Sequence, residues 1–118
     1  IIEGQGSLFH PAYAAVTLGL IHGSQPDLML LCHDPARLAI DGFEAYPIPA
    51  ISDCIRRYEE AARLTNPAAR VAGISLITVN LDEDRADEIC AQISESTGLP
   101  CFDPLKQSSD AIVLALMS

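Results

Sequence analysis

The sequence has little positive charge. One lysine, Lys106, is among only 7 basic residues, against 16 acidic residues, so the formal net charge is −9 at pH 7. A surface this negative repels phosphate backbones and anionic lipid headgroups. We therefore expect neither a nucleic acid nor a membrane as a partner, and we favour a small-molecule substrate.

Long apolar runs and paired cysteines are also missing. No run approaches the roughly 18 to 20 residues that span a bilayer, and no basic stretch with an apolar core marks a signal peptide. Cys32, Cys54, Cys90 and Cys101 form no C-x-x-C pair, so their spacing supports neither a zinc knuckle nor a thioredoxin-like site. We expect four reduced thiols, packed mostly as small apolar groups, in a cytoplasmic protein.

The overall amino-acid composition is typical of one folded domain. The 118 residues are 49% hydrophobic with a mean hydropathy of +0.24, and a globule of this size buries about two-thirds of its unfolded surface. The chain opens without a methionine on Ile1-Ile2, which we interpret as part of a buried strand. We therefore expect residues 1–118 to begin inside a larger domain, so that the domain is incomplete at its N-terminus.

Apolar runs and turn residues predict alternating strands and helices. We expect strands at 1–3, 28–32, 71–79 and 100–103, with a loop over 34–49. We expect a buried helix at 12–22 that ends at Gly23. Three further helices are expected from Ser52 or Asp53 to 65, from Asn80 or Asp82 to 97, and at 108–117. Helical crossovers between successive strands give a mainly parallel sheet with flanking helices.

Polar residues gather where the expected strands end. They are Glu3, Gln5, Ser7 and His10 after the first strand, His33, Asp34 and Arg37 after the second, Thr78 and Asn80 after the third, and Asp103 and Lys106 after the fourth. In open parallel sheets, ligands bind beyond the carboxyl ends of the strands. The distribution therefore predicts a binding site at that edge of the sheet.

The segment Glu3-Gly4-Gln5-Gly6-Ser7 is the sharpest local feature. A carboxylate at a strand end can orient a water or a metal or act as a general base, and glycines let a ligand approach backbone N–H groups. A tight turn between a strand and a helix explains the same residues equally well. The segment is not a dinucleotide fingerprint, because Phe9 stands where the third glycine belongs, and the chain contains no Walker A sequence.

A second candidate group follows the second expected strand. His33 can act there as an acid or a base, and Arg37 can hold a carboxylate or a phosphate. A loop histidine that caps the next turn is the alternative, and His10 allows the same two interpretations. The histidine spacings match no ligand pattern, so we expect no metal site.

Several segments resemble one protein family. They are IIEGQGSLFHPAY at 1–13, LIHGSQPD at 20–27, LCHDP at 31–35 with Arg37, TNP at 65–67, GIS at 73–75, and TGLP at 97–100 with Asp103-Pro104. Together they resemble the D-glutamate N-acetyltransferase family, whose longer members carry a Rossmann-like domain and then a P-loop-like domain. This chain is similar to the last part of the second domain. The resemblance implies a three-layer, P-loop NTPase-like fold, with the Walker-A-like segment upstream of Ile1.

The resemblance also implies a reaction, which is transfer of an acetyl group from acetyl-CoA to the amine of D-glutamate in amino-acid metabolism. The Glu-Gly-x-Gly turn is also similar to one in dethiobiotin synthetase, where it lies near the nucleotide and magnesium. The chain departs from the expected Asn-Thr at Ile77-Thr78, and Asn80 is displaced from the position of a base-contacting asparagine. The alternatives are a P-loop ATP-dependent ligase or kinase that uses ATP with Mg²⁺, and a non-catalytic nucleotide-sensing domain.

Positions at strand ends suggest roles for the candidate residues. Glu3 or His33 would take a proton from the substrate ammonium, the N–H groups of Gly4 to Ser7 would stabilise the oxyanion, and Arg37 would hold a substrate carboxylate. Gln5, His10 and Asn80 complete the expected binding set. We expect the full-length protein to be a homo-oligomer and residues 1–118 alone to be inactive, because the sheet needs strands that precede Ile1.

Overall fold

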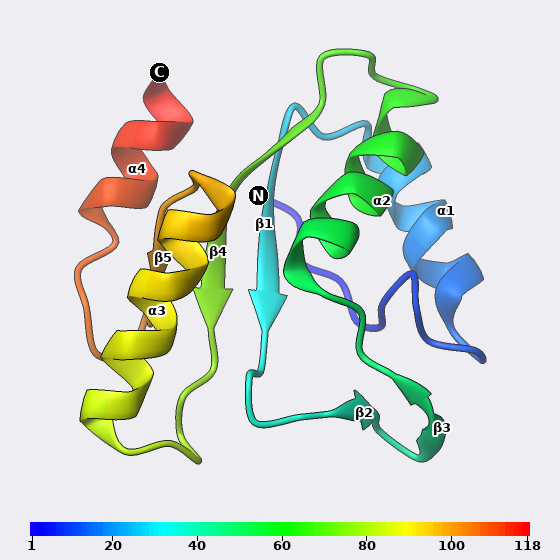
Figure 1. The fold of residues 1–118 in the computed structure, drawn as a ribbon. Helices are drawn as coiled ribbons and strands as arrows, with labels where there is room; N and C mark the ends of the chain where they lie inside the picture. Colours follow the sequence, from blue (N-terminus) through cyan, green and yellow to red (C-terminus); the bar gives the residue numbers. More distant parts are fainter. The chain divides into compact units, whose positions relative to one another are not determined.

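The computed structural model describes residues 1–118, which form two compact units. The first unit contains Ile1–Asp27 and Leu38–Arg70, and the second contains Leu28–Arg37 and Val71–Ser118. Each unit has its own helices and strands (Figure 1).

The second unit is built on a three-stranded sheet. The strand order is β1-β4-β5, with β1 at Leu28–His33, β4 at Arg70–Leu76 and β5 at Cys101–Phe102. β4 pairs with β5 in parallel, and the arrows of β1 and β4 point the same way in Figure 1. The central strand β4 is buried along most of its length, whereas Leu30 in the edge strand β1 is 41% exposed. The predicted α/β fold with a mainly parallel sheet and flanking helices is confirmed.

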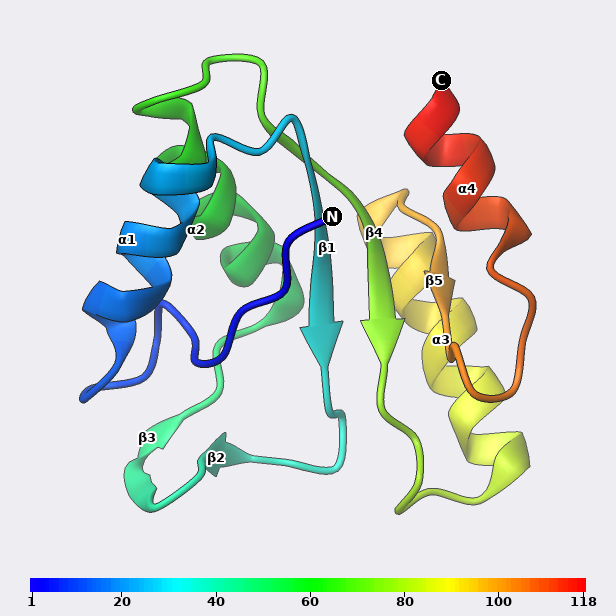
Figure 2. The same cartoon turned by 180° about the vertical axis from the view of Figure 1, so that it is seen from behind.

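Helix α3, Glu83–Thr97, lies against one face of this sheet. Asp82 precedes it, acidic residues occupy its first turn where the helix dipole favours negative charge, and Gly98 ends it in the left-handed conformation. Its buried Cys90 thiol donates to the Cys101 carbonyl oxygen in β5 at 2.9 Å. The helix stands in front of β5 in Figure 1 and behind it in Figure 2.

Helix α4, Asp110–Met117, reaches the sheet through its buried Ile112. A Cβ atom on Gly73 of β4 would lie 2.3 Å from Ile112 Cδ1 and 3.2 Å from the Pro100 carbonyl oxygen. That oxygen accepts the Ile74 N–H at 2.8 Å as part of the pairing of β4 with β5. Glycine at position 73 thus leaves room for the close approach of Ile112 and Pro100, and a larger residue would displace the end of the Ile112 side chain.

Two helices form the body of the first unit. α1 is Ala14–Ser24, α2 is Ile51–Arg63, and the His22 Nε2–H of α1 donates to the Ala61 carbonyl oxygen of α2 at 2.8 Å. After α2, the Asn66 side-chain amide donates to the Pro26 carbonyl oxygen at 3.1 Å and to the Asp27 carboxylate at 2.9 Å. These bonds join segments of the first unit that are far apart in the sequence.

A short hairpin occupies part of the expected loop over 34–49. β2 at Ala39–Ile40 pairs antiparallel with β3 at Phe43–Pro47, around the turn Asp41-Gly42. The loop prediction was therefore wrong for these residues. Asp-Gly between two short apolar segments is a recognised hairpin signal, which the prediction passed over because each segment is so short.

No strand forms at residues 1–3, contrary to the prediction. Ile1 and Ile2 are 129% and 62% exposed, residues 1–5 form no helix, strand or turn, and Gly4 and Gly6 lie close to Leu20 and Thr17 of α1. Two apolar residues do not make a strand unless a neighbouring strand accepts and donates their backbone hydrogen bonds. In this structure residues 1–3 are exposed.

Helix α1 also departs from the prediction of a buried helix at 12–22. It ends at Ser24 and is followed by Gln25, whose φ of 47° is left-handed, so Gly23 lies inside the helix. Only Thr17 and Ile21 are buried, and Val16 is 62% exposed. A wholly apolar composition did not reveal which face the helix would bury, because apolar residues occur all around it.

The remaining elements differ from the prediction only at their ends. α2 starts at Ile51 instead of Ser52 or Asp53, β4 ends at Leu76 instead of Val79, and α4 follows Ser109 instead of Ser108. All four cysteines are thiols, of which Cys54 and Cys90 are buried and Cys32 is exposed. None of the helices is both long enough and apolar enough to cross a membrane.

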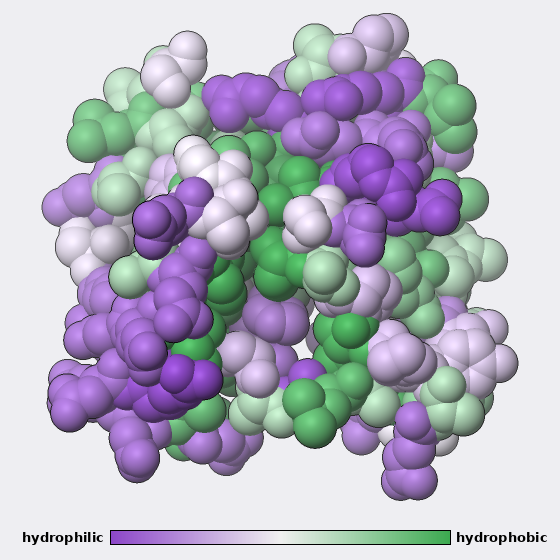
Figure 3. Space-filling view, in the orientation of Figure 1, coloured by the Kyte–Doolittle hydropathy of each residue, from purple (hydrophilic) through white to green (hydrophobic).

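Charged side chains cover the outer faces of α2 and α3. On α2, Arg56 pairs with Glu60 at 3.0 Å, and on α3, Arg85 pairs with Glu88 at 2.7 Å. Figure 3 shows hydrophilic surface over both helices. Exposed pairs of this kind contribute little stability, so both faces are solvated surface.

Candidate functional site

The glycine turn at residues 4–7 packs closely on α1. A Cβ atom on Gly4 would lie 2.1 Å from Leu20 Cδ2, and one on Gly6 would lie 3.1 Å from Thr17 Oγ1. Gly6 also has a φ of 89°, which favours glycine. The backbone N–H groups of Gly4 to Ser7 donate to no acceptor within the chain, and Glu3 beside them is exposed. The turn is therefore both a packing element and a row of open donors.

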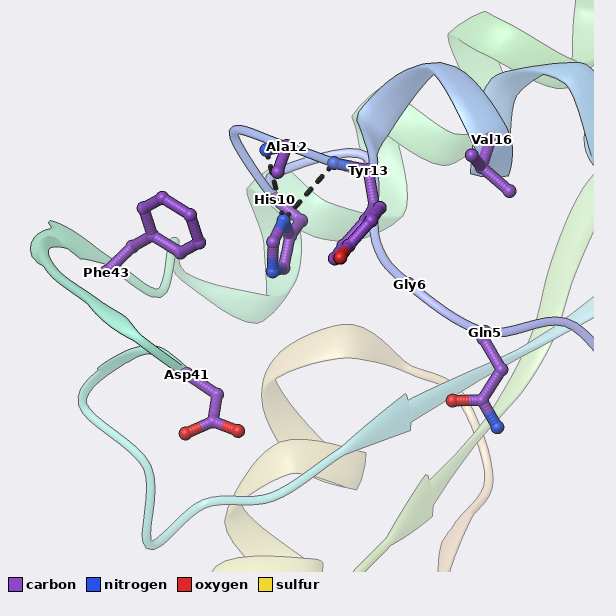
Figure 4. Close-up of a pocket in the computed structure, with 8 residues that line it drawn as sticks. All are labelled: Gln5, Gly6, His10, Ala12, Tyr13, Val16, Asp41 and Phe43. Atoms are coloured by element: carbon purple, nitrogen blue, oxygen red, sulfur yellow. Dashed lines mark hydrogen bonds between the residues drawn. The ribbon is translucent and has the colours of Figure 1, made fainter.

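A pocket of about 510 Å³ opens beside this turn in the first unit. Its lining comes from the N-terminal segment, the start of α1 and the β2–β3 hairpin: Gln5, Gly6, His10, Ala12, Tyr13, Val16, Asp41 and Phe43. Three aromatic rings form one side, with the His10 ring 4.7 Å from that of Tyr13 and 5.1 Å from that of Phe43, between ring centres. In Figure 4, Asp41 and Gln5 approach the space below His10 from opposite sides.

Backbone hydrogen bonds fix the orientation of the His10 ring. Its Nδ1 accepts the N–H groups of Ala12 at 3.1 Å and Tyr13 at 3.2 Å, drawn as dashed lines in Figure 4. A nitrogen that accepts hydrogen bonds carries no proton, so the neutral imidazole has its proton on Nε2. His10 therefore presents an N–H donor to the pocket, and its other nitrogen is already used by the turn before α1.

The second unit carries the other candidate residues at the carboxyl ends of its strands. The His33 carbonyl oxygen, at the end of β1, accepts the Ile77 N–H just after β4 at 2.9 Å. Arg37 lies in the turn after β1, and the exposed Asn80 lies in the turn after β4. Since β1 and β4 are neighbours, His33, Arg37 and Asn80 belong to one edge of the sheet.

The environment of His33 favours the neutral imidazole. Burial lowers the pKa of His33 below its usual value of 6.5, and the adjacent Asp34 carboxylate opposes part of that shift. A histidine with a lowered pKa is uncharged at neutral pH, so it can accept a proton from a substrate. This is the electrostatic requirement for a general base.

Asp34 organises the turn that carries Arg37. One Asp34 carboxylate oxygen accepts the Ala36 N–H at 3.0 Å, and the other lies 3.4 Å from Arg37 Nε. The guanidinium keeps its two terminal amino groups, which can bind a carboxylate or a phosphate in bidentate fashion. The Arg37 side chain is 57% exposed, so it is accessible to a ligand.

Two buried polar residues stand at the same edge. Thr78, 2% exposed, donates its hydroxyl hydrogen bond to Oδ2 of Asp103, which is 5% exposed. The other oxygen, Asp103 Oδ1, accepts the Leu105 N–H at 2.9 Å. This pair ties the segment after β4 to the segment after β5, and it supports the edge that carries His33. The side chains contain no group of three or more metal-ligating residues.

Residues 1–113 match a family described as "Domain of unknown function (DUF1611_C) P-loop domain". The chain belongs to the DUF1611 family. This DUF1611 chain is 47% identical to a D-glutamate N-acetyltransferase from Pseudoalteromonas sp and 37% identical to one from Tritonibacter scottomollicae. Each alignment of 116 residues covers 98% of this chain and 35% of the relative.

A solved structure agrees with the fold of the DUF1611 chain. The crystal structure of a DUF1611 family protein from Anabaena variabilis superposes with a TM-score of 0.88 at 41% identity, over 98% of this chain and 34% of that one. The chain thus spans about a third of the length of the relatives it matches. The family and the fold expected from the sequence are both confirmed.

The structure groups the predicted site residues of the DUF1611 chain by unit. Gln5, Gly6 and His10 line the pocket of the first unit, whereas Glu3, Gly4 and Ser7 lie outside its lining. His33, Arg37 and Asn80 belong to the sheet edge of the second unit.

Sequence reasoning missed five pocket residues, Ala12 and Val16 among them, and the other three carry polar or aromatic side chains. Tyr13, Asp41 and Phe43 line the pocket, and two of them are in the hairpin that was predicted as loop. The Asp-Gly pair was the available signal for that hairpin. Nothing in the sequence places the hairpin against His10, because that contact joins segments more than 30 residues apart.

Proposed function

We propose that this DUF1611 chain is the C-terminal domain of an N-acetyltransferase that acetylates the amine of D-glutamate or a similar amino acid. The supporting observation is 47% identity, over 98% of the chain, to a protein named D-glutamate N-acetyltransferase. Because the chain spans 35% of that relative, the proposed activity is that of the complete gene product that contains these residues. Acetyl-CoA, the proposed acyl donor, supplies a thioester carbonyl that an amine can attack.

His33 is the general base that we favour for this reaction. An ammonium group must lose a proton before its nitrogen lone pair can form the new C–N bond. The half-buried, neutral imidazole of His33 can take that proton at neutral pH. Glu3 is the second candidate, an exposed carboxylate beside the glycine turn.

The glycine turn suits stabilisation of negative charge. Attack on the thioester places a negative charge on the carbonyl oxygen, before the C–S bond breaks and CoA leaves as its thiol. Backbone N–H groups that already point at such an oxygen stabilise it without reorganising. The N–H groups of Gly4 to Ser7 have no acceptor within the chain, which supports this role as an alternative within the first unit, with Glu3 beside them as the base. It is separate from the assignments of His33 and Arg37, which belong to the second unit.

Arg37 suits the substrate carboxylate. D-glutamate carries two carboxylates, and the protein has a formal net charge of −9, so binding needs a local cation. The exposed guanidinium of Arg37 supplies one, held by Asp34 through Nε alone.

We expect Arg37→Ala to raise KM for D-glutamate by roughly 10- to 100-fold, the value of a lost charge-assisted hydrogen bond. KM for acetyl-CoA should change little, and Arg37→Lys should recover part of the loss. Steady-state kinetics with each substrate varied in turn measures both constants. Arg85→Ala, which removes another exposed arginine of the second unit, is the matched control. Equal increases in both KM values would remove Arg37 from the acceptor site.

Product identification tests the function itself. The complete gene product is incubated with acetyl-labelled acetyl-CoA and D-glutamate, and the amino-acid fraction is examined by mass spectrometry. The proposal expects labelled N-acetyl-D-glutamate that depends on the protein. Recovery of unlabelled D-glutamate alone, from a folded protein, would contradict it.

A P-loop ATP-dependent ligase or kinase is the second candidate, because the family is described as a P-loop domain. Mg²⁺ in such enzymes is held by one or two carboxylates together with substrate phosphates. Glu3 would be the carboxylate that this chain contributes. A strict requirement for Mg-ATP separates this candidate from the acetyltransferase, and absence of any turnover would favour a nucleotide-sensing domain.

A further inference from the structure

We propose that the pocket around His10 binds the adenine ring of a nucleotide. In the proposed function that ring belongs to acetyl-CoA, so the choice of source rests on that proposal. The pocket shares Gln5 and Gly6 with the glycine turn, and the adenine and the thioester of one CoA lie too far apart to reach the same turn. Placing the adenine here therefore excludes the oxyanion role of that turn. The ring chemistry rests on the pocket alone and applies equally to ATP.

The charge of the pocket excludes anionic groups. Among its lining residues Asp41 is the one with a formal charge, and no lysine or arginine is present. A phosphate or a substrate carboxylate would meet a like charge there without a compensating cation, which is unfavourable. The occupant is therefore a neutral or cationic group.

The pocket offers one fixed donor and one charged acceptor. Nε2–H of His10 is the donor, because Nδ1 already accepts two backbone N–H groups. The Asp41 carboxylate is the acceptor, and the Gln5 amide can serve in either role. Adenine has the complementary pattern, since its exocyclic amine donates and its ring nitrogens accept.

Aromatic and small apolar groups complete the fit. The rings of His10, Tyr13 and Phe43 form a contiguous cluster, and Val16 and Gly6 add apolar surface. Nucleobases stack well on such rings, and the stacking does not depend on charge. A planar base that carries an amine thus uses every feature of the pocket, whereas an aliphatic ammonium would leave the Nε2–H of His10 without an acceptor.

The decisive comparison is adenosine against purine riboside, which lacks only the exocyclic amine. Binding of each nucleoside to the complete gene product is measured by isothermal titration calorimetry. Adenosine should bind roughly tenfold or more tightly, because purine riboside leaves Asp41 without a donor. In Asp41→Ala the preference should fall to about twofold or less. Glu44→Ala, which removes an exposed carboxylate of the same hairpin outside the pocket, should keep the wild-type preference.

The affinities are compared once Asp41→Ala and Glu44→Ala are shown to unfold at the same temperature as the wild type, so that a lost preference reflects the pocket and not the fold. Equal affinities in the wild type, tighter binding of guanosine than of adenosine, or a preference that survives Asp41→Ala would overturn the proposal. Competition by CoA and by ATP identifies the source of the ring. If ATP displaces adenosine and CoA does not, the adenine pocket stands and the acetyl-CoA assignment fails.

Discussion

Replacing His33 with glutamine is expected to lower kcat for acetyl transfer by about 10²- to 10⁴-fold, the usual contribution of a general base. Glutamine keeps a similar size and a hydrogen-bonding amide, but it cannot take a proton from the substrate ammonium. Because burial lowers the pKa of His33 below 6.5, the wild-type rate should hold from neutral pH to below 6.5 and then fall as the pH drops through the lowered pKa. The variant should lose this acidic limb.

His22→Gln is the matched control for that prediction. His22 donates from Nε2 to the Ala61 carbonyl oxygen, and a glutamine amide can keep a donor there, so the rate should stay within about twofold of the wild type. The stability of the protein gives a second readout. A lowered folded-state pKa contributes stability that is present above 6.5 and is lost as the pH falls through the folded pKa. His33→Gln should remove that pH dependence, and unchanged kcat with an unchanged pH profile would rule out the base.

Replacing Thr78 with valine is expected to lower the free energy of unfolding by about 1–3 kcal/mol or more. Valine has nearly the same shape as threonine, but it leaves Asp103 Oδ2 buried without its donor. An unsatisfied group of this kind costs more when it is charged. Each kcal/mol lowers Tm by roughly 4–8 °C in domains of about 60–100 residues and by roughly 2–4 °C in domains of about 150–250 residues, so the shift expected here lies between these ranges. Thermal and urea unfolding followed by circular dichroism measure the effect.

Thr78→Ser separates the hydroxyl from the methyl group. Serine keeps the donor to Asp103 and loses only one methyl, so its loss of stability should be clearly smaller than that of Thr78→Val. If valine is as well tolerated as serine at this position, the buried hydrogen bond is not what holds the segments after β4 and β5 together.

Local patterns accounted for most of the fold. The unbroken apolar run at 28–32 predicted β1, and Gly98 with Pro100 predicted the end of α3, because strand length and helix-stopping residues are local properties. The prediction of a strand at residues 1–3 was wrong because strand formation there is not a local property. Whether Ile1 and Ile2 pair in a sheet or stay exposed depends on which segments lie beside them, and composition does not specify that.

The candidate site, like the fold, was predicted only where local sequence rules apply. The rule that ligands bind beyond the carboxyl ends of parallel strands placed His33, Arg37 and Asn80 at one sheet edge. Burial of His33, and with it the lowered pKa, depends on packing that no local pattern reports. Likewise the contact of His10 with Phe43 arises only when the hairpin folds against the N-terminal segment.

Release of CoA is the measurement that tests the acetyltransferase assignment most directly. The complete gene product is given acetyl-CoA with D-glutamate, L-glutamate or no acceptor, with and without Mg-ATP, and free thiol is followed with a thiol reagent. The no-acceptor blank accounts for protein thiols such as the exposed Cys32. We predict release that depends on D-glutamate and does not require ATP. No release under any condition, or ATP turnover with an acid acceptor in its place, would contradict the acetyltransferase assignment.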